Sequence, residues 1–217
     1  FMMSLEQALG KIGYSLSLHL ITDYELSNQL LPASFHIQNT DAILALEIFN
    51  RNYCEFLCTL GKPILFSDIY STFTQGDLSA DILVADNYTA SVKLYSSVIE
   101  DCKPKSIGFL GDPDYSLSFQ DRFKGFLSVT QKYGFSDSYK NHSIISNIQN
   151  FQNDIWMQNK FKTLEIPNLL VCANDILAMK ALTCLERLNI KVPDEVMVCG
   201  YDGTPAISSL YPALTTI

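Results

Sequence analysis

The clearest pattern of apolar and polar positions runs from Leu169 to Gly203. It begins with a short apolar run, Leu169–Ala173, which is typical of a strand buried on both faces. The pair Asn174–Asp175 then supplies good helix N-cap residues, and residues 176–188 show a broad apolar face at helical spacing. A second apolar run follows at residues 196–199. The pattern predicts a strand–helix–strand unit whose two strands are parallel neighbours.

The same alternation of apolar runs and helical patterns fills the chain before this unit. Expected strands cover residues 14–21, 41–47, 63–68, 81–87 and 106–111. Expected helices cover residues 1–11, 24–31, 49–60, 88–100, 119–133 and 155–164. Repeated strand–helix alternation indicates α/β structure with doubly wound parallel sheets. A crossover near residues 102–105 divides the chain into two expected subdomains, residues 1–103 and 104–217.

Polar residues gather where the expected strands end. Asn174, Asp175 and Asp202 each follow the carboxyl end of a strand, and these ends lie along one edge of a parallel sheet. Carboxylates accept hydrogen bonds and an amide both donates and accepts, so the set suits a neutral, hydroxyl-rich ligand and repels a phosphate. Taken singly, each residue is better explained by a helix cap or a turn. The three together favour a ligand site.

Composition narrows the classes of function. The 217 residues are 47% hydrophobic and 18% charged, which is typical of a globular protein, and no apolar run is long enough to span a bilayer. The net charge of −8 argues against direct DNA binding by this polypeptide, because DNA affinity depends on cationic side chains. The six cysteines and three histidines lack zinc-site spacing, so we expect free thiols in a reducing cytoplasm and neither a metal nor a cofactor.

Enzyme signatures are missing from the sequence. It contains no phosphate-cradling GxxxxGK[ST], no GxGxxG, no GxSxG elbow and no HExxH. The carboxylates at the sheet edge leave acid–base chemistry on a glycoside as an open alternative. We nevertheless predict a protein that binds its ligand and does not turn it over.

Three ordered motifs carry a family resemblance. ANDILAMKAL, VPDEVMVCGYDG and YPALTTI resemble the closing segment of the lactose-repressor/galactose-repressor family of bacterial transcription regulators. The resemblance covers nearly the whole chain and is strongest over residues 105–217. It implies a periplasmic-binding-protein-like fold of type I, with two subdomains joined by a hinge. By this resemblance, the DNA-reading helix-turn-helix, the first strand and the final return segment of the family are expected outside the sequence.

Individual site residues follow from the same resemblance. The segment SFQDRFKGF resembles the family segment in which an arginine, here Arg122, reaches the effector and a glycine, here Gly125, lets the helix pack. Phe119 is the candidate for an apolar ring face. The full set of expected effector-binding residues is Asp68, Asp86, Asn87, Ser118, Phe119, Arg122, Asn174, Asp175 and Asp202.

The implied function is that of a cytoplasmic ligand sensor. The resemblance implies the effector-binding and dimerisation core of a repressor of carbohydrate metabolism, whose sugar-like effector modulates operator binding by the separate helix-turn-helix. Phosphosugar, purine or protein effectors remain alternatives. A homodimer contact is expected from Leu177, Lys180, Ala181 and Tyr211. The main alternative function is a sugar receptor of a transport system, and a glycoside-acting enzyme ranks behind it.

Overall fold

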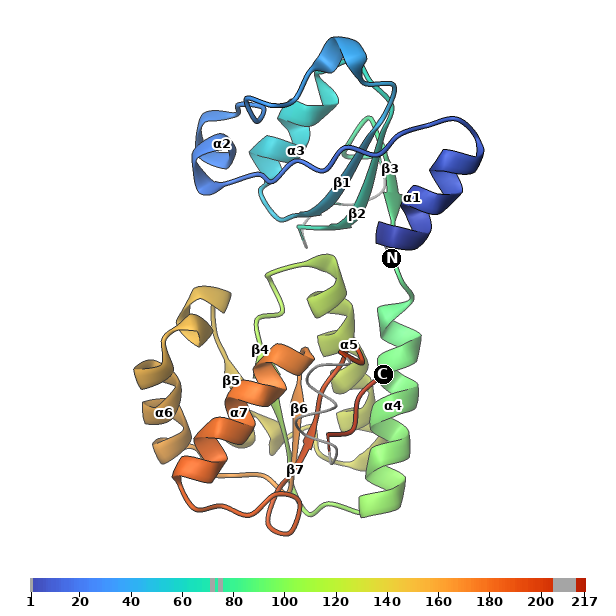
Figure 1. Cartoon of the computed structure of the whole chain (residues 1–217). Coiled ribbons are helices and arrows are strands. Elements are labelled where there is room, and N and C mark those ends of the chain that lie inside the picture. Colours follow the sequence, from blue (N-terminus) through green and yellow to red (C-terminus); the bar gives the residue numbers. More distant parts are fainter. Residues whose placement is uncertain (1, 71–72, 74–75, 205–213) are drawn as a thin grey trace.

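A computed structural model of the chain describes residues 2–70, 73, 76–204 and 214–217, which form two lobes (Figure 1). Each lobe contains one parallel sheet. The first sheet has the order β1-β2-β3, and the second has the order β5-β4-β6-β7. The strands are β1 (Ile43–Ile48), β2 (Ile64–Ile69), β3 (Asp81–Leu83), β4 (Ile107–Gly111), β5 (Ile144–Ile145), β6 (Leu169–Cys172) and β7 (Met197–Cys199). The predicted α/β class with parallel sheets is confirmed.

Helices flank both sheets in the order that the sequence pattern predicts. They are α1 (Met2–Lys11), α2 (Asp23–Asn28), α3 (Arg51–Cys58), α4 (Asn87–Cys102), α5 (Leu117–Tyr133), α6 (Asp154–Thr163) and α7 (Asp175–Arg187). Short 3₁₀ turns are η1 (Ile37–Asn39), η2 (Tyr139–His142) and η3 (Ile148–Gln152). Most helices begin at a side-chain cap, such as Ser116 for α5 and Asn174 for α7, which satisfies an otherwise free backbone N–H of the first turn.

The strand expected at residues 14–21 is wrong. This segment is irregular, and Leu18 and Leu20 are 79% and 82% exposed. A strand is stabilised by a neighbour that takes its backbone hydrogen bonds, and no described strand pairs with this segment. The alternating apolar pattern was therefore insufficient evidence for a strand.

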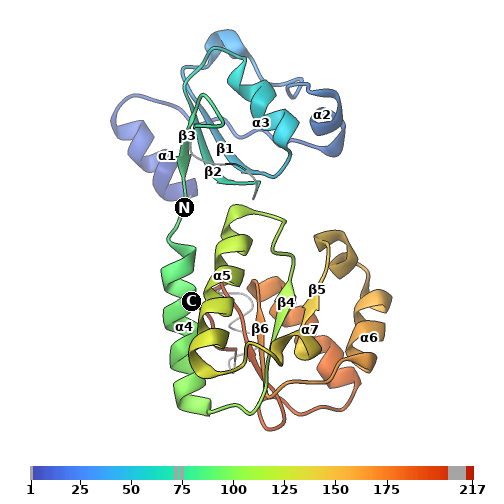
Figure 2. The same cartoon turned by 180° about the vertical axis from the view of Figure 1, so that it is seen from behind.

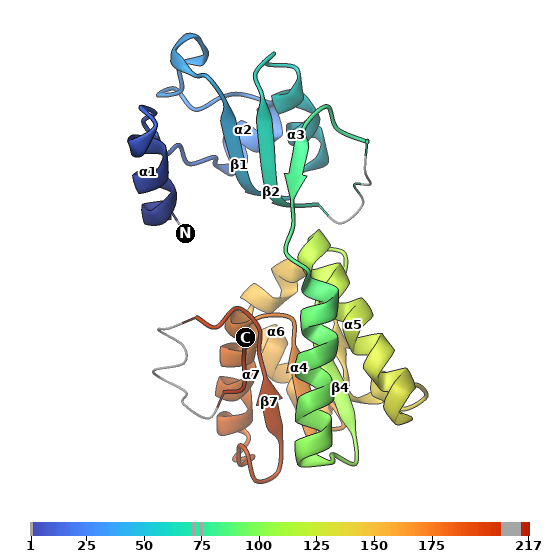
Figure 3. The same ribbon diagram turned by 90° about the vertical axis from the view of Figure 1, so that its right-hand side faces the viewer.

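The two hydrophobic cores place the boundary between the lobes before α4. Residues of β1, β2 and α3 fill the first core, whereas Tyr95, Val98 and Ile99 of α4 are buried in the second. Figure 3 shows the chain crossing between the lobes from β3 to α4, and Figures 1 and 2 show α4 beside α5. The expected division at residues 103 and 104 therefore comes one helix too late, because the apolar face of α4 matches the second core.

Gly125 sets the close approach of α4 and α5. An ideal Cβ at this position would lie 2.8 Å from the Cβ of Ser91 and 3.3 Å from the carbonyl oxygen of Tyr88. The expectation that this glycine lets its helix pack is confirmed, because a side chain here would overlap α4.

We expect Gly125→Ala to lower the free energy of unfolding by about 1–3 kcal/mol, since an extra methyl group in a packed interface forces the backbones apart. Urea denaturation measures this loss. The matched background is Ser91→Gly, which removes the opposing Cβ. In that background the alanine should cost less, and an equal cost in both backgrounds would contradict the explanation.

The remaining features of the fold concern thiols and membranes. All six cysteines are unpaired, and burial raises the pKa of the thiols of Cys54 and Cys199 to about 12. Cys102 is exposed at the end of α4.

Within the described residues, every helix is too short or too polar to cross a bilayer.

Candidate functional site

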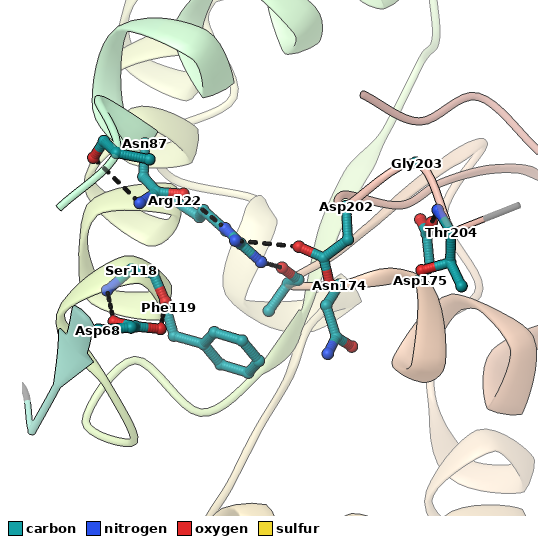
Figure 4. Close-up of polar contacts among 12 residues, drawn as sticks. Asp68, Asn87, Ser118, Phe119, Arg122, Asn174, Asp175, Asp202, Gly203 and Thr204 are labelled. Atoms are coloured by element: carbon teal, nitrogen blue, oxygen red, sulfur yellow. Dashed lines mark hydrogen bonds and ion pairs between the residues drawn. The ribbon is translucent and has the colours of Figure 1, made fainter. Parts of the chain in front are cut away.

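The carboxyl edges of the two sheets meet, and polar residues from both lobes lie between them (Figure 4). Asp68 is at the end of β2 in the first lobe, and Ser118 is in the first turn of α5 in the second. The carboxylate of Asp68 accepts hydrogen bonds from the backbone N–H of Ser118 at 3.3 Å and from its hydroxyl at 2.6 Å. The free N–H groups at a helix N-terminus favour a carboxylate, so this contact holds the lobes together.

Arg122 is the centre of the polar cluster on the second lobe. Its Nε donates to Oδ1 of Asn87 at 3.1 Å, and its Nη1 donates to the carbonyl oxygen of Ala173 at 2.8 Å. Its Nη2 forms an ion pair with Asp202 at 3.0 Å. The guanidinium also lies 3.8 Å from the ring centroid of Tyr201. Arg122 is only 7% exposed. Its contacts link α4, α5 and the ends of β6 and β7 at one point (Figure 4).

Helix starts position most of these side chains. Asp86 accepts from the backbone N–H of Thr89 and caps α4, which fixes Asn87 as the first residue of that helix. Asn174 accepts from the backbone N–H of Leu177 at 2.9 Å and caps α7. The capping interpretation that the sequence left open for Asn174 therefore describes that residue well, and the structure shows Asp86 capping its helix in the same way. Asn87, Asn174 and Asp202 still share the sheet edge that Arg122 organises (Figure 4).

Two carboxyl groups near the cluster have shifted pKa values. Partial removal from water raises the pKa of Asp202, and the guanidinium of Arg122 offsets only part of this effect. The backbone N–H of Thr89 lowers the pKa of the exposed Asp86. Asp202 also has a positive φ of 116°, which is uncommon for a residue other than glycine and occurs often at functional sites.

Asp175 is placed differently from the other expected site residues. It is fully buried, and its carboxylate accepts from the hydroxyl of Thr216 at 2.6 Å and from the backbone N–H of Thr204 at 2.8 Å. Gly200 is required beside it, because an added Cβ would lie 2.3 Å from Oδ1 of Asp175. The hydrogen bonds of Asp175 therefore connect the chain after β7 to the start of α7. These contacts give Asp175 a supporting role at the sheet edge.

Aromatic residues at the interface of the lobes were missed from the sequence. Phe49, directly after β1, lies 4.6 Å from Tyr115 between ring centroids, and Tyr115 lies 5.4 Å from Phe119. Phe119, the expected ring face, is itself buried between Tyr115 and Arg122. Phe49 could have been found by the strand-end rule that found Asp68. Tyr115 gave no such signal, because it lies in the turn between β4 and α5.

Tyr115 also lies in an acidic environment. Burial raises the pKa of its phenol first, and the negative charges of Glu47, Asp68 and Asp112 raise it further. The hydroxyl therefore stays protonated at neutral pH and remains a hydrogen-bond donor. Glu47, at the end of β1, was not among the residues expected from the sequence, and its charge acts on both Tyr115 and Asp202.

The expected dimer residues divide into three groups. Leu177 and Ala181 are 3% and 0% exposed and pack in the core of the second lobe, so they are unavailable to a partner. Both residues lie on the face of α7 that packs against the sheet. Lys180 is partly exposed and forms an ion pair with Asp154 of α6 at 3.1 Å. Tyr211 lies outside the described residues.

A separate pocket lies between β5 and α6. It has a volume of about 240 Å³ and contains none of the expected effector residues. Its lining is Asn141, Ser143, Ile144, Ile145, Ser146, Trp156, Lys160, Thr163 and Leu164. Among the residues that the structure describes, no group of three or more potential ligands could hold a metal ion. The polar cluster between the lobes therefore remains the best candidate for a functional site.

Two parallel-sheet lobes with a polar site between their carboxyl edges define the class of two-lobed ligand-binding domains. A family model described as "Periplasmic binding protein-like domain" matches residues 103–217. The chain belongs to this family. The predicted recognition is thereby confirmed at the level of the effector-binding core.

Known proteins with similar sequences are bacterial regulators. The chain is 28% identical over 114 residues to the HTH-type transcriptional repressor PurR of Photobacterium profundum, covering 52% of this chain and 34% of that protein. It is 29% identical over 214 residues to the ribose operon repressor of Bacillus subtilis, covering 98% of this chain and 61% of that protein. The chain thus spans between about a third and three fifths of these curated relatives.

Solved structures share the fold at lower identity. A regulatory protein of the LacI family from Chloroflexus aggregans has a TM-score of 0.78 at 16% identity, and the match covers 100% of this chain and 76% of that chain. A periplasmic binding protein/LacI transcriptional regulator from Alkaliphilus metalliredigens, complexed with D-xylulofuranose, has a TM-score of 0.69 at 18% identity and covers 99% and 76%. These likenesses support the type I two-lobed fold.

Proposed function

We propose that this chain is the effector-binding core of a bacterial transcription regulator that responds to a small sugar-like ligand. The observation that carries the proposal is the Arg122 cluster at the meeting edges of the two sheets, where Asn87 and Asp202 hold a buried guanidinium. Relatives named as repressors support the regulatory role. They also favour binding without catalysis over a glycoside-acting enzyme, and regulation over transport.

The chemistry of the cluster supports a neutral polyhydroxylated effector. Within the described residues, protein acceptors take three of the five guanidinium N–H groups of Arg122, which leaves donors for a ligand. Oδ1 of Asp202 takes part in the ion pair, and Oδ2, which accepts from no other described residue, is an acceptor for hydroxyl groups. Asp68 and Glu47 add negative charge on the first-lobe side, which disfavours a phosphorylated ligand. The sugar complex of the Alkaliphilus protein and the name of the ribose operon repressor agree with this class.

The proposed regulator acts as a homodimer on operator DNA. Ile176 of α7 is 53% exposed and Ile155 of α6 is 72% exposed, and the Lys180–Asp154 ion pair joins their two helices. This surface, together with the segment that contains Tyr211, is the proposed contact between copies. The net charge of −8 fits a sensing module whose DNA contacts come from a separate helix-turn-helix. Ligand binding would shift the equilibrium between two arrangements of the lobes and so alter operator affinity.

A thermal-shift panel tests the proposed function. The protein is heated alone and with aldoses, disaccharides, phosphosugars and purine bases. A ligand that binds only the folded state stabilises it by about 2.7 kcal/mol at a hundred times its dissociation constant, which raises the melting temperature. We expect a shift with at least one neutral sugar. A shift with purine bases or phosphosugars alone would contradict the sugar class, and no shift with any compound would contradict a small-molecule sensor.

A further inference from the structure

The rings between the lobes extend the description of the candidate site. Phe49 comes from the first lobe, whereas Tyr115 and Phe119 come from the turn before α5 and from α5 itself. The guanidinium of Arg122 continues the series, because it lies 5.6 Å from the ring centroid of Phe119 and 3.8 Å from that of Tyr201. Aromatic rings and one cation therefore form a continuous line from β1 to the end of β7.

Tyr115 is the accessible member of this line on the second lobe. Phe119 is 6% exposed and Tyr201 is 9% exposed, so neither offers a free face to a ligand. Tyr115 is only partly buried, and its ring is flanked by Phe49 and Phe119. Ring contacts at these separations are favourable and hold an aromatic side chain in one orientation. A fixed, partly exposed ring is suited to stack on the apolar face of a cyclic sugar.

The Asp68–Ser118 contact lies beside this stacking surface and joins the same two lobes. It holds the end of β2 to the first turn of α5, close to the point where Phe49 meets Tyr115. Both contacts cross between the lobes, so separating the lobes would break them together. The surface formed by Phe49 and Tyr115 is thus a property of the arrangement described here, in which the two carboxyl edges meet.

We propose that Tyr115 is a specificity-determining residue of the site between the lobes, and that it selects a ring-closed sugar over the open-chain polyol of the same carbon skeleton. This inference rests on the proposed function and specifies the ligand class of the same site. A pyranose or furanose ring presents a flat array of C–H groups that an aromatic face can cover. An open-chain alditol carries similar hydroxyl groups for Arg122 and Asp202 but has no such face.

The protonated phenol of Tyr115 adds a second discriminating contact. Glu47, Asp68 and Asp112 surround it with negative charge, so it serves as a donor to a ring or hydroxyl oxygen. Stacking and donation can be separated experimentally. Tyr115→Phe keeps the ring and removes the hydroxyl, whereas Tyr115→Leu keeps apolar volume and removes the aromatic face.

The test compares matched pairs of ligands by titration calorimetry on the protein. The pairs are D-ribose with ribitol, D-xylose with xylitol and D-glucose with sorbitol. For the pair whose sugar binds, we expect the wild type to prefer the sugar and Tyr115→Leu to weaken sugar binding roughly 3–10-fold while changing alditol binding less than twofold. Tyr115→Phe should retain the ring preference. Tyr24→Leu, an exposed tyrosine of the first lobe, is the control and should change neither affinity.

The possible failures can be told apart. If neither these pairs nor the thermal-shift panel yields a sugar that binds, the proposed function fails and this inference fails with it. If sugars bind without preference over their alditols, or if Tyr115→Leu weakens both members of a pair equally, the inference alone is overturned. The melting temperature of each ligand-free variant shows whether a loss of binding comes from loss of the fold.

Discussion

Replacement of Arg122 by alanine should abolish ligand-induced stabilisation and lower the stability of the ligand-free protein. The guanidinium is buried and serves Asn87, the carbonyl oxygen of Ala173 and Asp202 at once. Its removal leaves two buried acceptors without a donor and one carboxylate without its partner. We expect a loss of about 2–4 kcal/mol in the free energy of unfolding, since Asp202 keeps some access to water and is penalised less than a fully buried charge.

Denaturant unfolding and thermal shifts with the identified sugar measure both effects. Arg122→Lys should recover little, because a single ammonium cannot reproduce the planar fork that reaches three partners. Lys124→Ala is the matched control on the same helix. Lys124 is 53% exposed and, within the described part of the chain, bonds only to nearby residues of α5, so its loss should leave both readouts unchanged. Unaltered stability of Arg122→Ala would show that the cluster does not hold the sheet edge together.

Replacement of Asp175 by alanine should destabilise the protein without weakening ligand binding by the folded fraction. Asp175 is fully buried, and its carboxylate accepts from two partly buried groups, the hydroxyl of Thr216 and the backbone N–H of Thr204. Losing both acceptors leaves two partly buried donors unpaired at a fully buried position, which costs about 2–4 kcal/mol. Asp175→Asn preserves the volume and one acceptor and should cost less.

Asn174→Ala is the neighbouring control for Asp175. It removes one N-cap hydrogen bond of α7 and should cost about 1 kcal/mol. Comparing the unfolding free energies of the two variants distinguishes the loss of a helix cap from the loss of the buried hydrogen bonds of Asp175. An Asp175→Ala protein as stable as the wild type would contradict the supporting role. If that stable variant had also lost ligand binding, Asp175 would be a ligand-binding residue.

The sequence was sufficient to predict the fold class. It was also sufficient to predict which residues lie at the carboxyl edge of a sheet, because that depends only on the direction of the strands. Strand–helix alternation implies parallel strands, and parallel strands place Asp68, Asn174 and Asp202 at carboxyl ends. That geometry needs no knowledge of packing. The same reasoning placed Asp175 beside Asn174 at the edge, but it could not show that Asp175 turns toward Thr204 and Thr216. Side-chain direction depends on neighbours that are distant in the sequence.

Packing between distant segments explains the other differences. The boundary between the lobes was placed after α4 because the helix follows the first sheet in sequence, whereas its apolar residues fit the second core. Leu177 and Ala181 were assigned to a dimer contact, although the burial of their face against the sheet makes them core residues. Tyr115 and Phe49 lie 66 positions apart, and only the approach of the two lobes brings their rings to 4.6 Å.

The most direct test of the central claim is the binding affinity of the identified sugar for Asp202→Asn compared with Lys160→Ala, measured by titration calorimetry. Asp202 lies in the Arg122 cluster, whereas Lys160 lines the separate pocket between β5 and α6. If the sugar binds between the lobes, Asp202→Asn should weaken it about tenfold or more, because a charged hydrogen-bond acceptor is lost, while Lys160→Ala should bind as the wild type does. Unchanged affinity of Asp202→Asn, or loss of binding in Lys160→Ala, would place the sugar away from the Arg122 cluster. Either result would contradict the claim that the ligand binds between the two lobes.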